Sequence, residues 1–122
     1  IVVATNAPLD ARNLQRLAKR AFMGLAKTGG IASNGSGDYV IAFSTDEAIR
    51  VTHSDSSSLQ SHRVLRNEEV SPLFMAVIEA TEEAILNSLF MAETMKGKDG
   101  HIVEALPMDQ VIPILKKYNV IR

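Results

Sequence analysis

The stretch Thr28–Asp38 holds the densest set of side chains suited to chemistry, between a helical pattern and an apolar strand. It contains four glycines, two serines, an asparagine and an aspartate. Ser36 and Asp38 stand two residues apart, so in an extended segment they project from the same side. We therefore expect a hydrogen-bonded hydroxyl–carboxylate pair, a combination that can assist proton transfer at a reacting centre.

Two sharper motifs fail in this loop. A phosphate-binding loop of the form G-x-x-x-x-G-K-[ST] matches at Gly30 and Gly35, but Ser36 stands where lysine is required. A nucleophile elbow G-x-S-x-G needs glycines where Asn34 and Asp38 stand, and both motifs lead into a helix, not a strand. An ordinary turn after a helix stop is the competing interpretation. Asn34 and Gly35 then support the loop, and in the active-site interpretation they also contribute to substrate binding.

Other candidate groups point to ordinary surfaces. The three histidines are scattered without a second ligand at metal-binding spacing, so we expect no metal site and no cofactor. They are His53, His62 and His101. The glutamates of the second predicted helix are expected to form a solvated face. They are Glu79, Glu82, Glu83 and Glu93.

Composition excludes several classes of partner. The 122 residues carry 13 Lys+Arg and 14 Asp+Glu, a net charge of −1, which disfavours nucleic-acid binding. No apolar run approaches the roughly 20 residues that span a bilayer, so no membrane partner is expected. The chain has no cysteine, which removes disulfides and thiolate chemistry and leaves the compartment open between cytoplasm and periplasm.

The elements that must position the loop follow from hydrophobic patterning. Asp10 can cap an amphipathic helix that Gly29-Gly30 terminates. Around it we expect a strand at 1–5, an interior strand at 39–44 that is apolar on both faces, and a weaker strand at about 49–52. The serine run at 54–58 is the most linker-like part and is expected to belong to a long surface excursion.

The second half predicts two helices and a short strand. Ser71-Pro72 opens a helix to about Met95, whose later part is apolar on nearly every side and is expected to be buried. Ala76, Ala80, Ala84 and Ser88 form a small-residue row that would let another helix approach closely. A strand at 101–106 and a helix from Pro107 to about Tyr118 follow, the latter kinked or shortened by Pro113. Strands interleaved with helices predict an α+β or α/β layer architecture.

The opening run Ile1–Thr5 is apolar and β-branched from its first residue. Chain termini are usually loose and solvated, so a chain that begins inside a strand predicts a longer, cleaved precursor. A new terminus made by cleavage carries a free α-amine that can serve as a base for its own side chain.

The sequence resembles a known family over nearly its whole length. The resemblance rests on Ile1–Leu9, Gly24–Gly30, Ser33–Asp38, Ile41–Thr45, Gly100-His101 and Val103–Pro107. These segments are similar to the β-subunit of the DmpA-type aminopeptidases, the L-aminopeptidase/D-amidase-esterases and β-peptidyl aminopeptidases. The loop Ser33–Asp38 and the strand after it are the most specific part.

The resemblance implies an α+β fold of the αββα four-layer sandwich type, similar to N-terminal nucleophile hydrolases, with residues 1–122 as a single domain piece. It implies a precursor that cleaves itself into a larger α and a smaller β chain, the α chain remaining bound and supplying the rest of the fold. The serine nucleophile would begin the β chain, a few residues before Ile1. Ser36 matches the second active-site serine, and Asp38 matches the acidic residue two positions on.

The implied function is an aminopeptidase or amidase that releases N-terminal residues from short peptides, amides or esters. Its expected assembly is a homo-oligomer of αβ units. Two alternatives stay open at this stage. One is an acyltransferase of the ornithine acetyltransferase type, with a threonine nucleophile, and the other is a non-catalytic assembly subunit.

Overall fold

The computed structural model describes residues 1–51, 53 and 57–122. The chain divides into two compact units, residues 1–83 and 84–122, and each is described by itself. The expectation of a single domain piece over residues 1–122 stays a prediction.

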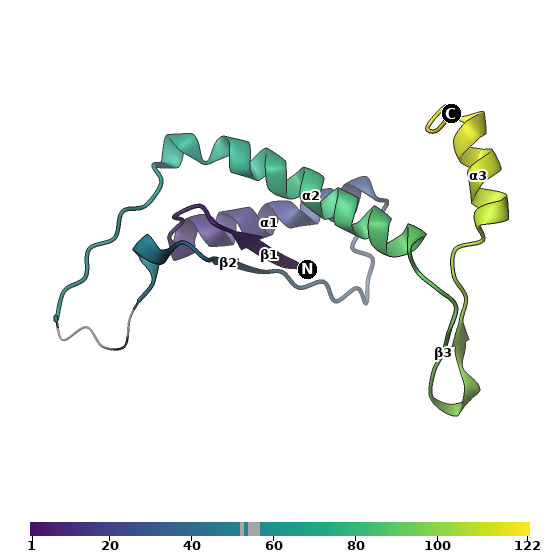
Figure 1. Cartoon of the computed structure of the whole chain (residues 1–122), viewed down its shortest axis with the longest axis horizontal. Helices are drawn as coiled ribbons and strands as arrows, with labels where there is room; N and C mark the ends of the chain where they lie inside the picture. Colours follow the sequence, from purple (N-terminus) through teal and green to yellow (C-terminus); the bar gives the residue numbers. More distant parts are fainter. Residues whose placement is uncertain (52, 54–56) are drawn as a thin grey trace. The chain divides into compact units, whose positions relative to one another are not determined.

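The first unit opens with a strand–helix–strand motif: β1 (Val2–Thr5), α1 (Ala11–Lys27) and β2 (Ile41–Ser44) (Figure 1). The strands pair in parallel, with Val2 opposite Ile41 and Thr5 opposite Ser44. Asp10 caps α1 by accepting a hydrogen bond from the Asn13 backbone N–H at 2.8 Å. Gly29 follows the helix with a φ of 96°, the left-handed conformation expected of a helix stop. The predicted cap and stop are both confirmed.

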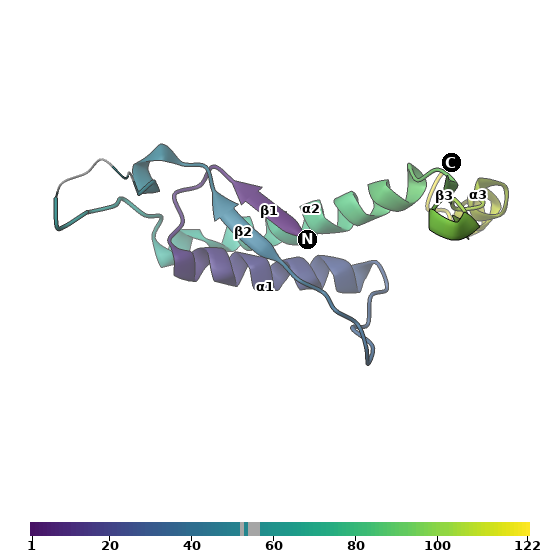
Figure 2. The ribbon, with the colours of Figure 1, turned by 90° about the horizontal axis from the view of Figure 1, so that it is seen from below.

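One hydrophobic core joins a face of this sheet to α1 and to the first part of α2 (Ser71–Phe90). Figure 2 shows α1 running along the sheet with α2 behind it. The buried core residues are Leu9, Leu17, Ala21, Val70 and Val77. Because both helices share this core with the sheet, and Val40 packs against it, the core positions the start of β2.

The helices α1 and α2 approach each other at Gly24. A Cβ atom on this glycine would lie 2.6 Å from the Ile78 carbonyl oxygen and 2.7 Å from Thr81 Cβ. Beside this crossing the Arg20 guanidinium lies 3.4 Å from the centre of the Phe74 ring. The predicted small-residue row on α2 is exposed, so the close approach depends on Gly24 instead.

The sheet face opposite the core is apolar and exposed within this chain. Val2, Ile41 and Phe43 are 70%, 66% and 43% exposed. The expectation of an interior strand at 39–44 is therefore wrong for the described residues of this chain, because β2 pairs only with β1 there and one of its faces is open.

The weaker strand expected at 49–52 is absent over residues 49–51, and Thr52 lies outside the described residues. Glu47–Ile49 form a 3₁₀ turn, η1, because Asp46 caps it by accepting from the Ala48 N–H at 2.7 Å. Of the serine run at 54–58, residues 54–56 also lie outside the described part. A second 3₁₀ turn, η2 (Asn67–Glu69), precedes α2.

The predicted second helix ends at Phe90, not at about Met95. The cause is a hairpin: β3 (Met95–Lys96) pairs antiparallel with β4 (Ile102–Val103), which requires Met95 to be extended. Asp99 and Gly100 turn the chain with φ of 57° and 80°, in the 3₁₀ turn η3 (Lys98–Gly100). Sequence patterning missed β3 and made β4 too long.

The second unit ends with α3 (Met108–Lys117), preceded by Pro107 as expected. Helical structure continues for four residues past Pro113, so this proline does not shorten α3. The end of α2 was expected to be buried but is open within the described part of this chain, since Leu86 and Leu89 are 40% and 47% exposed. No helix among the described residues is long and apolar enough to cross a membrane.

Candidate active site

The loop between α1 and β2 contains a tight turn just before the candidate pair. The Ser36 backbone N–H donates to the Ser33 carbonyl at 2.8 Å, with Asn34 and Gly35 as the central residues. Gly35 has a φ of 93°, a value that the third position of such a turn requires and that glycine adopts without strain. The turn therefore fixes the backbone from which the Ser36 side chain projects.

The predicted hydroxyl–carboxylate pair is present. Ser36 Oγ donates a hydrogen bond to Asp38 Oδ2, and both residues are exposed within this chain. Since the hydroxyl hydrogen is used in this bond, Ser36 Oγ offers only lone pairs to a third group. The pair thus presents an acceptor and a negative charge together.

Asn34 and Gly35 are placed in the turn, but the Asn34 side chain makes no hydrogen bond to any residue in the described part of the chain. Its side chain is exposed. The geometry supports a loop role for Gly35, while the substrate-binding role of both residues stays a prediction.

The first residue of the chain lies beside the same loop. The Ile1 amine donates to the Tyr39 carbonyl at 2.7 Å, and the Ile41 N–H donates to the Ile1 carbonyl at 3.0 Å. These bonds continue the parallel register, in which Val2 lies opposite Ile41. Tyr39 was not singled out from the sequence, although parallel pairing of two apolar strands around one helix would have indicated it.

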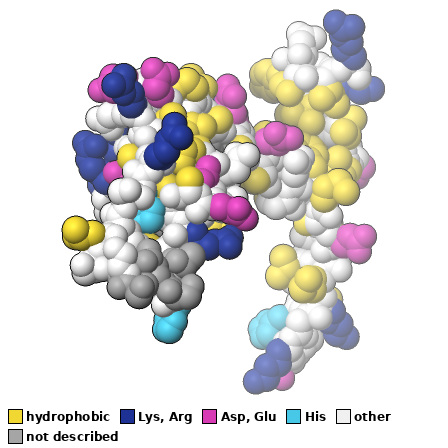
Figure 3. All heavy atoms as spheres, turned by 60° about the vertical axis from the view of Figure 1, so that its left-hand side comes forward, with side chains coloured by type: hydrophobic (Ala, Val, Ile, Leu, Met, Phe, Trp, Pro, Cys, Tyr) yellow, Lys and Arg dark blue, Asp and Glu magenta, His cyan; other side chains and the backbone are white. Residues whose placement is uncertain are grey.

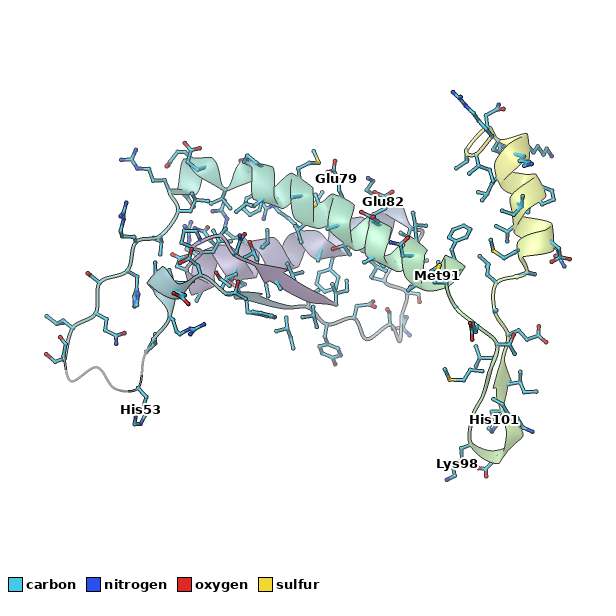
Figure 4. All side chains as sticks on the ribbon, in the orientation of Figure 1. His53, Glu79, Glu82, Met91, Lys98 and His101 are labelled. Atoms are coloured by element: carbon cyan, nitrogen blue, oxygen red, sulfur yellow. The ribbon has the colours of Figure 1, made fainter. Side chains whose placement is uncertain are left out.

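The histidines and the glutamates of α2 form no metal site among the described residues. Figure 4 shows His53 on the loop after η1 and His101 in the hairpin of the second unit. Within the described residues no group of three His, Cys, Asp or Glu side chains is placed to hold a metal ion. Glu79 is exposed on α2, and Glu82 pairs with Lys27 of α1.

Comparison with known proteins identifies the family. The sequence pattern of peptidase family S58 matches residues 1–103. The chain belongs to this family. Two S58 relatives of the genus Sphingosinicella carry the name β-peptidyl aminopeptidase BapA. The protein of S. microcystinivorans is 42% identical over 119 residues, which cover 98% of this chain and 30% of the relative. The protein of S. xenopeptidilytica is 37% identical, over 95% of this chain and 29% of the relative.

Solved structures match the fold. The PH0078 protein from Pyrococcus horikoshii OT3 is 48% identical with a TM-score of 0.86, over 97% of this chain and 33% of that chain. The L-aminopeptidase D-Ala-esterase/amidase of Ochrobactrum anthropi is 32% identical with a TM-score of 0.84, over 97% and 33%. It is described as a prototype of the serine aminopeptidases and a new variant of the N-terminal nucleophile hydrolase fold.

These matches confirm the expected mixed α+β fold related to N-terminal nucleophile hydrolases. This S58 chain spans about a third of the length of the relatives and structures that it matches. The chain contains a strand–helix–strand motif, and Ser36 and Asp38 lie in the loop just before β2.

Proposed function

We propose that this chain is the β piece of an aminopeptidase or amidase that releases N-terminal residues from short peptides, amides or esters. Membership of peptidase family S58 supports hydrolysis of amide bonds. In this proposal the nucleophile is a serine a few residues before Ile1, and Ser36 and Asp38 assist it.

The observation that carries this proposal is the register between β1 and β2. Val2 lies opposite Ile41. Ile1 is hydrogen-bonded to Tyr39 and to Ile41, the residues on either side of Val40. Continued upstream, the same parallel register sets the second and third residues before Ile1 opposite Asp38 and Gly37. In this proposal a nucleophile at either position would lie beside the Ser36–Asp38 pair.

The proposed chemistry uses the free amine of that terminal serine. Its pKa of about 7.7–8.0 lets it accept the hydroxyl proton near neutral pH. The serine oxygen then attacks the substrate carbonyl, and the scissile bond breaks as the protonated amine gives its proton to the departing amine or alcohol. A water molecule then hydrolyses the resulting acyl-enzyme ester, which releases the acid and restores the serine.

The pair has a defined part in these steps. Ser36 Oγ, with its own hydrogen donated to Asp38, can accept a hydrogen bond from the amine and orient its lone pair toward the serine hydroxyl. Once the amine holds the transferred proton, the nearby Asp38 carboxylate stabilises the positive charge. Both effects favour the transition state more than the resting enzyme.

We also propose that a larger α chain from the same precursor covers the exposed sheet face that contains Val2, Ile41 and Phe43. The inward-facing residues between them, Val3 and Ala42, are also apolar, and apolar side chains on both faces are typical of a strand packed on two sides. The relatives are about three times as long as this chain, which leaves material for such a layer. Association of αβ units into a homo-oligomer belongs to the same proposal.

The test is turnover of an amino-acid p-nitroanilide by the complete, processed protein. Ser36→Ala and Asp38→Asn should each lower turnover per folded molecule by roughly 10²-fold or more, the usual scale for losing a positioned acid–base partner. Self-cleavage should slow as well, because the same nucleophile performs it. Ser33→Ala is the matched control, since it makes the same change three residues away and removes no side-chain hydrogen bond recorded in the described part.

The competing interpretation makes the opposite forecast. If the loop is only a turn, Ser36→Ala and Asp38→Asn lower the melting temperature and leave turnover per folded molecule unchanged. Measuring the folded fraction beside the rate separates the two, and unchanged turnover in both variants removes the pair from the active site.

A further inference from the structure

A recess lies in the first unit, at the opposite end of the sheet from Ser36 and Asp38. It has a volume of about 430 Å³. Pro8, which follows β1, and Asp46, which follows β2, both line it. It therefore lies at the carboxyl end of a parallel strand pair, where open α/β sheets commonly bind ligands. The recess is open to solvent, with Arg63, Arg66 and Glu69 exposed, and its volume is within the range of small-molecule sites.

The walls of this pocket are held in place by the backbone. The Leu65 N–H donates to the Pro8 carbonyl at 2.8 Å, which ties the segment before η2 to the residues after β1. Asp46 Oδ1 accepts from the Ala48 N–H at 2.7 Å, and the Asp46 N–H donates to Ser44 Oγ at 3.1 Å. The carboxylate of Asp46 thus has a fixed position and a second oxygen available.

The lining carries both signs of charge. Arg63 and Arg66 supply two guanidinium groups, and Asp46 and Glu69 supply two carboxylates. Neither guanidinium has a hydrogen bond or ion pair with any residue in the described part of the chain. Figure 3, which brings this end forward, shows basic and acidic side chains close together there. Pro8 and Leu65 form an apolar part of the pocket wall.

We infer that this pocket binds a free amino acid with an apolar side chain. Its carboxylate would be held by Arg63 and Arg66, since guanidinium groups match carboxylates in charge and shape. Its ammonium would be held by Glu69 and the spare oxygen of Asp46. A lining with equal numbers of acidic and basic groups suits a zwitterion and disfavours a multiply charged anion such as phosphate.

The test is calorimetric titration of the complete, processed protein with L-leucine, N-acetyl-L-leucine, L-leucinamide and inorganic phosphate. Leucine should bind at least tenfold more tightly than the two analogues, each of which lacks one charge. The double variant Arg63→Gln/Arg66→Gln should weaken leucine roughly tenfold or more, the effect of losing charge-assisted hydrogen bonds. Arg50→Gln is the matched control, because Arg50 is exposed on the same segment and does not line the pocket.

A second variant keeps the proposal testable if the double variant does not fold. Glu69→Gln should weaken leucine and leave the weaker binding of N-acetyl-leucine unchanged, because only leucine carries the ammonium group. Equal leucine affinity in wild type, double variant and Glu69→Gln would overturn the proposal, as would phosphate binding at least as tight as leucine, or no binding of any probe. This proposal does not depend on the proposed peptidase function, because the ligand class is inferred from the residues that line the pocket. Ser36→Ala, which should lower peptidase activity, should therefore leave leucine binding unchanged.

Discussion

Replacing Gly24 by alanine tests how closely α1 and α2 are packed. The added Cβ would lie 2.6 Å from the Ile78 carbonyl oxygen and 2.7 Å from Thr81 Cβ, where ordinary contact begins at 3.4 Å. The two contacts would thus be shorter than an ordinary contact by 0.8 Å (3.4 − 2.6) and 0.7 Å (3.4 − 2.7). Neither neighbouring atom is the end of a flexible side chain, so the helices must separate.

The magnitude follows from two opposing effects. Overpacking of this kind costs about 1–3 kcal/mol, while alanine improves helix propensity over glycine by about 1 kcal/mol. The difference is a net loss of between about 0 and about 2 kcal/mol. Each kcal/mol lowers the melting temperature by about 2–4 °C for a protein of about 150–250 residues, and by less for a longer one.

Thermal unfolding of the complete protein, followed by circular dichroism, measures this shift. Ala26→Gly, on the exposed side of α1, is the matched control and should cost about 1 kcal/mol through propensity alone. A higher melting temperature for Gly24→Ala than for the wild type would refute the close crossing, because only the propensity gain would then be acting.

Three further changes have expected outcomes. Asp10→Ala removes the cap of α1, whose carboxylate accepts from Asn13, and should cost about 1 kcal/mol in denaturant unfolding; an unchanged midpoint would contradict the cap. Gly35→Ala puts a side chain at a φ of 93° and should cost about 1–2 kcal/mol and reduce p-nitroanilide turnover, a result that a flexible loop would not give. Lys27→Met breaks the partly exposed pair with Glu82 and should cost under about 1 kcal/mol, with the difference vanishing in 1 M salt.

The features readable from the sequence were those set by local chemistry. The Asp10 cap, the Gly29 stop and the Ser36–Asp38 pair each depend on residues within a few positions, and the structure has all three. The tight turn before the pair has the same local origin.

What the sequence did not reveal depends on partners distant in the chain. Met95 looked helical until pairing with Val103 made it extended. Apolar patterning on both faces predicted an interior strand at 39–44, yet Ile41 is exposed because this chain has nothing to cover that face in its described part. The close approach of α2 to α1 at Gly24 could not be predicted either, because a single glycine in a helix does not indicate which element packs against it.

The parallel pairing of β1 with β2 also has a kinetic consequence. Val2 and Ile41 are 39 positions apart, and closing a loop of that length costs about 3 kcal/mol in chain entropy before any strand contact compensates it. Helix α1 lies inside the loop and can form first, which shortens the search. Under the proposed function, the residues before Ile1 meet Ser36 and Asp38 only after this closure. The rate of self-cleavage of a newly made precursor would then measure how fast its sheet assembles. A precursor that had not yet folded would have no peptidase activity.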